Sequence, residues 1–174
     1  PSKAHPYRYG TSGCVYTSGC GVCASLMVLR NSTTRVFNTR QWTHRCLGMG
    51  ARAAEGTDMA VVARYMKEKY GLDYAITTDM DRLVAHLKQG YKAIINVSGG
   101  GKMLFSNSGH YVLAAGIDKN GNLIILDPYW YDGKFTLTAA RRKYTRVKNG
   151  REVYVRPADL KGDVLSLWLF TPKR

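Results

Sequence analysis

The sequence predicts an α+β fold in which N-terminal helices pack against an antiparallel β-sheet. Apolar residues recur at helical spacing through the first half of the chain, and short apolar runs separated by Gly, Asn and Asp dominate the second half. Because the helices precede the strands rather than alternate with them, we expect antiparallel pairing. The length of 174 residues suits one core, so we expect residues 1–174 to form one domain.

The predicted helices lie in the first ninety residues. Residues 21–30 are apolar on most faces, which favours a buried helix. Residues 57–70 form a stronger pattern that starts with Thr57 and Asp58 as cap residues and stops at Gly71. A further helix is predicted over 79–88, and a short helical turn over 40–47.

The predicted strands follow from residue 93 onward. Short apolar runs occupy 93–97, 111–115, 123–126 and 165–170, and each is bounded by turn residues. The sequence Lys119–Asn122 contains Asn-Gly, which favours a tight hairpin turn between the second and third of these strands.

The charge of the chain is strongly positive. It carries 26 Lys and Arg against 12 Asp and Glu, a formal net charge of +14, which predicts a polyanionic partner such as nucleic acid, an anionic membrane or a cell-wall polymer. One basic cluster lies at 141–148, where a solvated surface turn is an equally good interpretation. No nucleic-acid-binding motif accompanies it, so we expect no nucleic-acid partner.

Targeting signals are not visible in the sequence. No segment approaches the ~20 apolar residues that a membrane-spanning helix requires, so we expect no transmembrane segment. Residues 1–6 have no apolar core, and we therefore expect the protein to be made without a signal peptide.

The most informative motif is Ser18-Gly19-Cys20-Gly21 before the first predicted helix. The positive end of a helix dipole lowers the pKa of a thiol and favours the thiolate. A base and an orienting acid occur later, with His110 entering one predicted strand and Asp127 leaving the next. The hairpin would bring both to one end, but its arms differ in length, so direct pairing requires a bulge or a longer turn. Cysteine, histidine and acid in this layout indicate a cysteine-nucleophile hydrolase.

Each of these residues also has a structural interpretation. His110 can be a satisfied core histidine, and Asp127 before Pro128 is a common turn residue. The glycines beside Cys20 can serve the turn itself. Cys23 can be a small buried helix residue.

The cysteines allow two other interpretations. Cys20 and Cys23 form a Cys-x-x-Cys pair, but turn residues precede it where a redox motif requires a strand. Zinc held by four cysteines, or by three with His44 in place of Cys46, is the second alternative, with irregular ligand spacing. That cysteine set is Cys14, Cys20, Cys23 and Cys46.

Three short segments resemble the signatures of papain-like cysteine peptidases, closest to the branch that resembles bacteriocin-leader peptidases. They are Ser18–Gly21, Gly109–Val112 and Ile125–Pro128. The resemblance covers about residues 9–131 and implies a papain-like fold without cofactor or metal. It implies Cys20 as nucleophile, His110 as general base and acid, and Asp127 as the residue that orients the imidazole.

The sequence departs from the family pattern in two places. Val22 stands where proline is frequent, and no glutamine precedes Cys20 to complete an oxyanion hole. The backbone N–H of Cys20 can supply one donor. We expect oxyanion or substrate contacts from five further residues: Tyr9, Ser12, Tyr16, Gly109 and Trp130.

Charge and resemblance together predict the substrate. We expect a monomeric peptidoglycan-degrading endolysin, an antimicrobial endopeptidase or amidase whose basic surface binds the anionic polymers of the bacterial cell wall. It would act at the cell wall or outside the cell. The alternatives are a protein or leader-peptide protease, a basic zinc-containing module that binds cell wall or nucleic acid, and an inactive relative of the peptidases.

Overall fold

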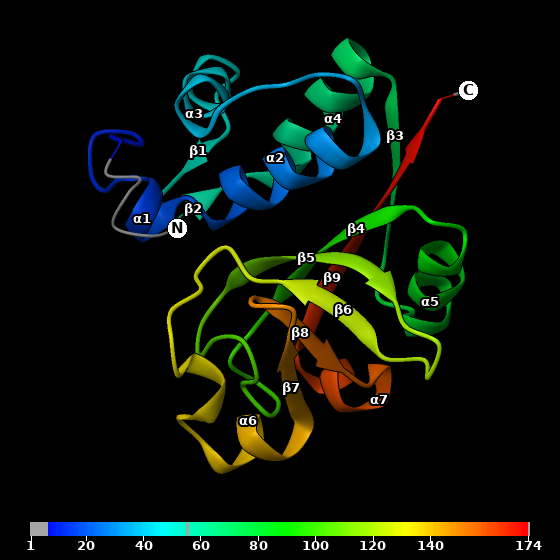
Figure 1. Ribbon diagram of the computed structural model, residues 1–174. Helices are drawn as coiled ribbons and strands as arrows, with labels where there is room; N and C mark the ends of the chain where they lie inside the picture. The colour runs from blue at the N-terminus through cyan, green and yellow to red at the C-terminus, as the bar shows by residue number, and fades with distance from the viewer. Residues whose placement is uncertain (1–6, 55, 174) are drawn as a thin grey trace.

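The computed structural model describes residues 7–54 and 56–173. The expectation of a missing signal peptide rests on residues 1–6, which lie outside the described residues. A group of helices covers one face of a seven-stranded sheet, and a further helix packs on the opposite side (Figure 1). The covering helices are α1 (Val15–Ser18), α2 (Cys20–Ser32), α3 (Thr39–Gly48) and α4 (Met59–Tyr70). The helix on the other side is α5 (Met80–Lys88).

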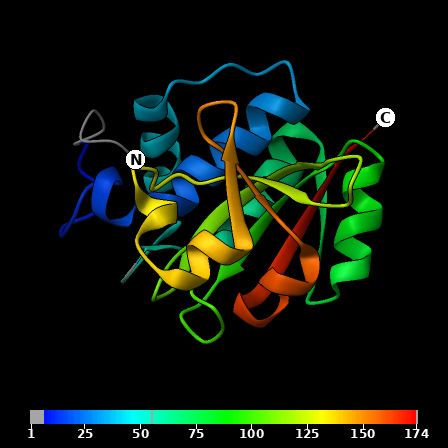
Figure 2. The same ribbon diagram turned by 60° about the horizontal axis from the view of Figure 1, so that its bottom comes forward.

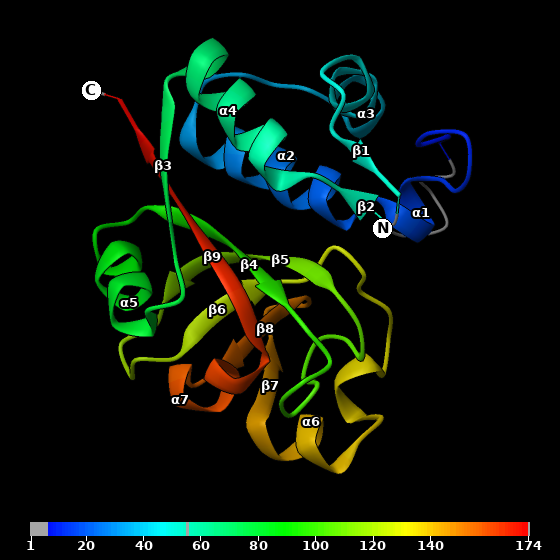
Figure 3. The same cartoon turned by 180° about the vertical axis from the view of Figure 1, so that it is seen from behind.

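The sheet is antiparallel throughout, with the order β3-β9-β4-β5-β6-β8-β7. The strand that comes last in sequence, β9, lies between β3 and β4, as the view from behind shows (Figure 3). The strands are β3 (Leu72–Thr77), β4 (Lys92–Val97), β5 (His110–Ile117), β6 (Leu123–Leu126), β7 (Thr145–Lys148), β8 (Glu152–Val155) and β9 (Val164–Pro172). A separate two-stranded sheet consists of β1 (Arg52–Ala53) and β2 (Gly56–Thr57). The predicted α+β class with an antiparallel sheet is confirmed.

Two hydrophobic cores lie on the two faces of the sheet. Because side chains alternate along a strand, Ile94 of β4 enters the core under α2–α4, whereas Ile95 enters the opposite core. In β5, Leu113 enters the core under α2–α4, and Val112 enters the opposite core. The centre of the sheet is therefore buried on both faces, which fixes β5 relative to α2.

The helices follow the predictions, with shifted boundaries. Asp58 caps α4 by accepting hydrogen bonds from the next helical N–H groups, whereas Thr57 belongs to β2. Asp79 caps α5 in the same manner. The predicted turn at 40–47 is a full helix, α3, because Asn38 and Gln41 form a reciprocal capping box at its start.

The second half contains more elements than predicted. The four predicted strands are β4, β5, β6 and β9. The strands β7 and β8 of this half were not predicted, nor were β1, β2 and β3 of the first half. The basic cluster at 141–148 forms the end of α6 (Ala139–Tyr144) and the strand β7 rather than a turn. Short helical turns complete this half: η1 (Lys134–Thr136), α7 (Pro157–Leu160) and η2 (Lys161–Asp163). Among the described residues, no helix is both long and apolar enough to span a membrane.

Candidate active site

Cys20 is the first residue of α2, and two glycines allow the helix to begin there. A Cβ at Gly19 would lie 2.5 Å from the carbonyl oxygen of Val15 in α1. A Cβ at Gly21 would lie 2.6 Å from the Cβ of Thr57 in β2. The glycines therefore serve close packing, and this packing places the thiol at the positive end of the helix.

Gly21→Ala is expected to lower the free energy of unfolding by about 1–3 kcal/mol, because the new methyl group overpacks against Thr57. The matched control is Gly48→Ala in α3, since no atom lies within 4 Å of a Cβ added there. Urea denaturation of both variants measures the difference. Equal effects of the two substitutions would contradict the packing argument.

The β5–β6 hairpin brings His110 and Asp127 together. His110 is the first residue of β5, and Asp127 follows the last residue of β6. The register pairs Leu113 with Leu126 and shifts between Ala114 and Gly116. This irregularity accommodates the unequal arms of the hairpin, as the sequence predicts. Nε2–H of His110 donates a 2.7 Å hydrogen bond to Oδ1 of Asp127.

The thiol of Cys20 hydrogen-bonds to the ring of the same histidine. Because Nε2 faces Asp127, Nδ1 is the nitrogen left for sulfur. Burial raises the pKa of Cys20, but the hydrogen bond and charge of His110 outweigh it and lower the pKa below its ordinary value. Backbone hydrogen bonds from Tyr111 and Gly21 act in the same direction. Burial lowers the pKa of His110, yet Asp127 and Cys20 raise it to about 9. Both shifts favour the thiolate–imidazolium pair over a thiol and a neutral imidazole.

Asp127 is held on both oxygens. Oδ1 also accepts a 2.8 Å hydrogen bond from the N–H of Tyr129, and Oδ2 lies 2.5 Å from Nζ of Lys134. The side chain of Asp127 is 0% exposed and that of Lys134 is 3% exposed. Burial raises the pKa of Asp127, but His110 and Lys134 lower it below its usual range. Sequence reasoning missed Lys134. The available signal was a lysine directly before Phe135, just after the aromatic run that follows Asp127.

Two hollows flank the segment 128–133 that connects Asp127 to Lys134. The first has a volume of about 340 Å³, and the second about 500 Å³. Trp130 lines the first hollow together with residues of α2 and Arg151, which lies in the turn of the β7–β8 hairpin. Figure 2 shows this hairpin rising toward α2. Tyr129 and Tyr131 line the second hollow. The aromatic residues therefore form walls on both sides of the triad acid.

The five other predicted contact residues separate into different environments. Tyr16 lies beside Tyr129, with 5.7 Å between the two ring centroids, and Gly109 is exposed directly before His110. Trp130 lines the first hollow. Ser12 is exposed in the loop before α1, and its carbonyl accepts a hydrogen bond from Arg52.

Tyr9 requires a correction, because it cannot contact a substrate. It is fully buried, and its hydroxyl lies 2.9 Å from Oγ1 of Thr57. The hydroxyl is satisfied inside the helical core, which also leaves the pKa of Tyr9 raised to about 12 through burial.

The alternative cysteine chemistries have no matching geometry in the described residues. All four cysteines, Cys14, Cys20, Cys23 and Cys46, are free. Burial raises the pKa of Cys23 to about 11 and that of Cys46 to about 12, so both remain thiols near neutral pH. In the part of the chain that the structure describes, no three His, Cys, Asp or Glu side chains are grouped as a metal ion would require.

A helix-borne cysteine facing a histidine and an acid on a sheet defines a papain-like cysteine peptidase. Comparison with known proteins agrees with this class. The model of the Peptidase_C39-like family matches residues 3–153. The protein belongs to the Peptidase_C39-like family and is a cysteine peptidase.

A solved structure shares the fold. The crystal structure of the peptidase domain of Streptococcus ComA, a bi-functional ABC transporter involved in a quorum-sensing pathway, superposes with a TM-score of 0.57 at 15% identity. The match covers 88% of this chain and 91% of the ComA chain. No curated protein sequence matches the chain.

Proposed function

We propose that the protein hydrolyses peptide bonds in a polypeptide substrate, with Cys20 as nucleophile, His110 as general base and acid, and Asp127 as the residue that orients the imidazole. The observation that carries this proposal is the convergence of the three side chains at the start of α2, with the hydrogen bond from His110 to Asp127 measuring 2.7 Å.

The catalytic cycle follows from the protonation states. The Cys20 thiolate attacks the carbonyl carbon of the scissile amide, and the N–H at the start of α2 stabilises the oxyanion that forms. The His110 imidazolium donates its proton to the departing amine, which leaves an acyl-enzyme. His110 then takes a proton from water, the hydroxide attacks the thioester, and Cys20 departs as a thiolate.

Several features support a polypeptide substrate. The family and the fold are those of peptidases, including the peptidase domain of the ComA transporter. Aromatic side chains line the two hollows beside the site, and such surfaces bind extended chains through side-chain pockets.

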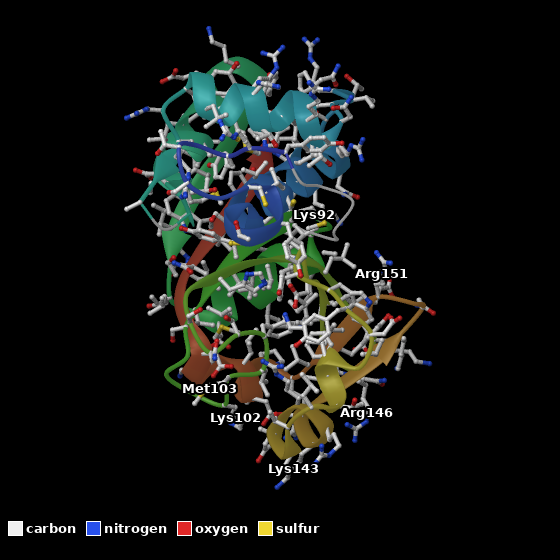
Figure 4. The ribbon with its side chains drawn as sticks, turned by 90° about the vertical axis from the view of Figure 1, so that its left-hand side faces the viewer. Lys92, Lys102, Met103, Lys143, Arg146 and Arg151 are labelled. Atoms are coloured by element: carbon white, nitrogen blue, oxygen red, sulfur yellow. The ribbon has the colours of Figure 1, made fainter. Side chains whose placement is uncertain are left out.

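Peptidoglycan is the second candidate substrate, and the charge of the chain favours it. Lys143 and Arg146 project from α6 and β7, and Arg151 projects from the hairpin beside the first hollow (Figure 4). A positive surface attracts anionic wall polymers, and this attraction weakens with salt because the screening length is ~8–10 Å near physiological ionic strength.

The proposal is tested by incubating the protein with a peptide library derived from a bacterial proteome and, in parallel, with purified peptidoglycan. Mass spectrometry identifies new amino termini in each sample. We expect cleaved peptides with the native protein and none with the Cys20→Ala variant. Release of wall fragments without peptide cleavage, across low and high salt, would replace the polypeptide assignment with the peptidoglycan one. No product from either substrate would contradict both.

A further inference from the structure

We propose that Lys134 is a positioning residue of the catalytic site, whose buried ammonium group holds Asp127 ionised and oriented toward His110 and thereby favours the Cys20 thiolate. The inference rests on the roles assigned to these three residues in the proposed function.

The geometry ties Lys134 to the acid and to the segment beside it. Nζ lies 2.5 Å from Oδ2 of Asp127 and donates a 3.0 Å hydrogen bond to the carbonyl of Tyr129. The ammonium also lies 5.3 Å from the ring centroid of Tyr129 and 5.9 Å from that of Tyr131. One side chain therefore joins the two ends of the segment 127–134, which separates the two hollows.

The backbone of Lys134 is itself fixed from the other side. Nη1 of Arg141 donates to the carbonyl of Lys134 at 3.2 Å, and its Nε donates to the carbonyl of Met103 at 3.2 Å. The Arg141 guanidinium therefore donates its hydrogen bonds to backbone carbonyls. Among the hydrogen bonds of the described residues, Lys134 is the cation that donates to Oδ2 of Asp127.

Four neighbouring groups alternate in charge: the thiolate of Cys20, the imidazolium of His110, the carboxylate of Asp127 and the ammonium of Lys134. Together they are neutral. Removing the Lys134 ammonium leaves the other three groups with one net negative charge. These groups then bind a proton more tightly. Proton loss from Cys20 would then occur at higher pH. The Cys20 charge acts on Lys134 in turn, since it opposes the lowering of the Lys134 pKa by burial.

The tyrosines and the cysteine around these four groups have raised pKa values, so they stay neutral near neutral pH. Burial raises the pKa of Tyr9 and of Tyr111 to about 12, and that of Cys23 to about 11. A hydrogen bond with Tyr16 raises the pKa of Tyr129. Thiolate formation at the site is therefore assigned to Cys20 together with His110.

Alkylation of Cys20 by iodoacetamide tests the proposal without a peptide substrate. Its rate is measured against pH in the native protein and in Lys134→Met, Lys134→Arg and Lys143→Met, with the Cys20 peptide quantified by mass spectrometry. Lys143 is the matched control, because it is an exposed lysine in the same half of the molecule (Figure 4).

We expect the midpoint of thiolate formation to move upward by about one pH unit in Lys134→Met. Lys134→Arg retains the charge, so its midpoint should lie close to that of the native protein. Lys143→Met should leave the midpoint unchanged. An unchanged or lower midpoint in Lys134→Met, or an equal shift in Lys143→Met, would overturn the inference. Because alkylation requires no peptide, the expected profile combined with absent peptide cleavage would contradict the proposed function alone.

A second measurement requires no substitution at Lys134. In the native protein, the ¹⁵N resonance of Nζ is titrated before and after the thiol is converted to its neutral carbamidomethyl form. Loss of the thiolate should lower the pH at which the ammonium loses its proton. Identical titration curves would contradict the coupling between Lys134 and Cys20.

Discussion

Cys20→Ala is expected to reduce peptide hydrolysis by more than about a thousandfold, because the substitution removes the attacking sulfur while the rest of the site remains. The fold should persist, since Ala is a good helix former. Initial rates on a cleaved library peptide measure the first effect, and thermal denaturation measures the second.

Cys14→Ala provides the control for this substitution. Hydrogen bonds with Thr17 lower the pKa of Cys14, as the site lowers that of Cys20, but the described hydrogen bonds of Cys14 include none to a histidine. Its loss should change the hydrolysis rate by less than about twofold. A Cys20→Ala variant that retains activity, or a Cys14→Ala variant that loses it, would reject Cys20 as the nucleophile.

Asp127→Ala is expected to impair both catalysis and stability. Hydrolysis should fall by at least about a hundredfold, because His110 loses the acceptor that fixes its orientation. The free energy of unfolding should fall by about 3–5 kcal/mol, because the buried ammonium of Lys134 loses its counter-charge. Peptide hydrolysis and urea denaturation measure the two effects separately.

Adding Lys134→Met to Asp127→Ala should recover part of the lost stability and none of the lost activity. Removing both members of a buried pair is less costly than removing one, since no uncompensated charge remains. Additive destabilisation in the double variant would show that the ion pair does not account for the cost of Asp127→Ala.

The fold was predictable where local sequence determines it. The helices α4 and α5 carry their own caps, Asp58 and Asp79, and the β5–β6 hairpin carries its own Asn-Gly turn. β3 has no such signal. Its Ile76 is 52% exposed, and the strand forms because β9 pairs along it, which is a contact distant in sequence.

The candidate site was predictable to the same extent. Cys20, His110 and Asp127 each stand at the edge of an element whose position the sequence predicts. Lys134 could not be assigned in this way, because its role depends on a return of the chain that closes the segment 127–134. The side-chain direction of Tyr9 likewise depends on Thr57, which reaches it only in the folded core.

The central position of β9 has a consequence for how the molecule is made. Leu72 of β3 pairs with Pro172, and Val97 of β4 pairs with Val164. Both β3 and β4 therefore pair with a strand that is synthesised much later. Such non-local pairing slows folding, because the chain loses the entropy of closing a long loop before the strand contacts stabilise it. A fragment that stops before Val164 lacks the bridge between β3 and β4. During synthesis, the seven-stranded sheet therefore stays incomplete until β9 has been made.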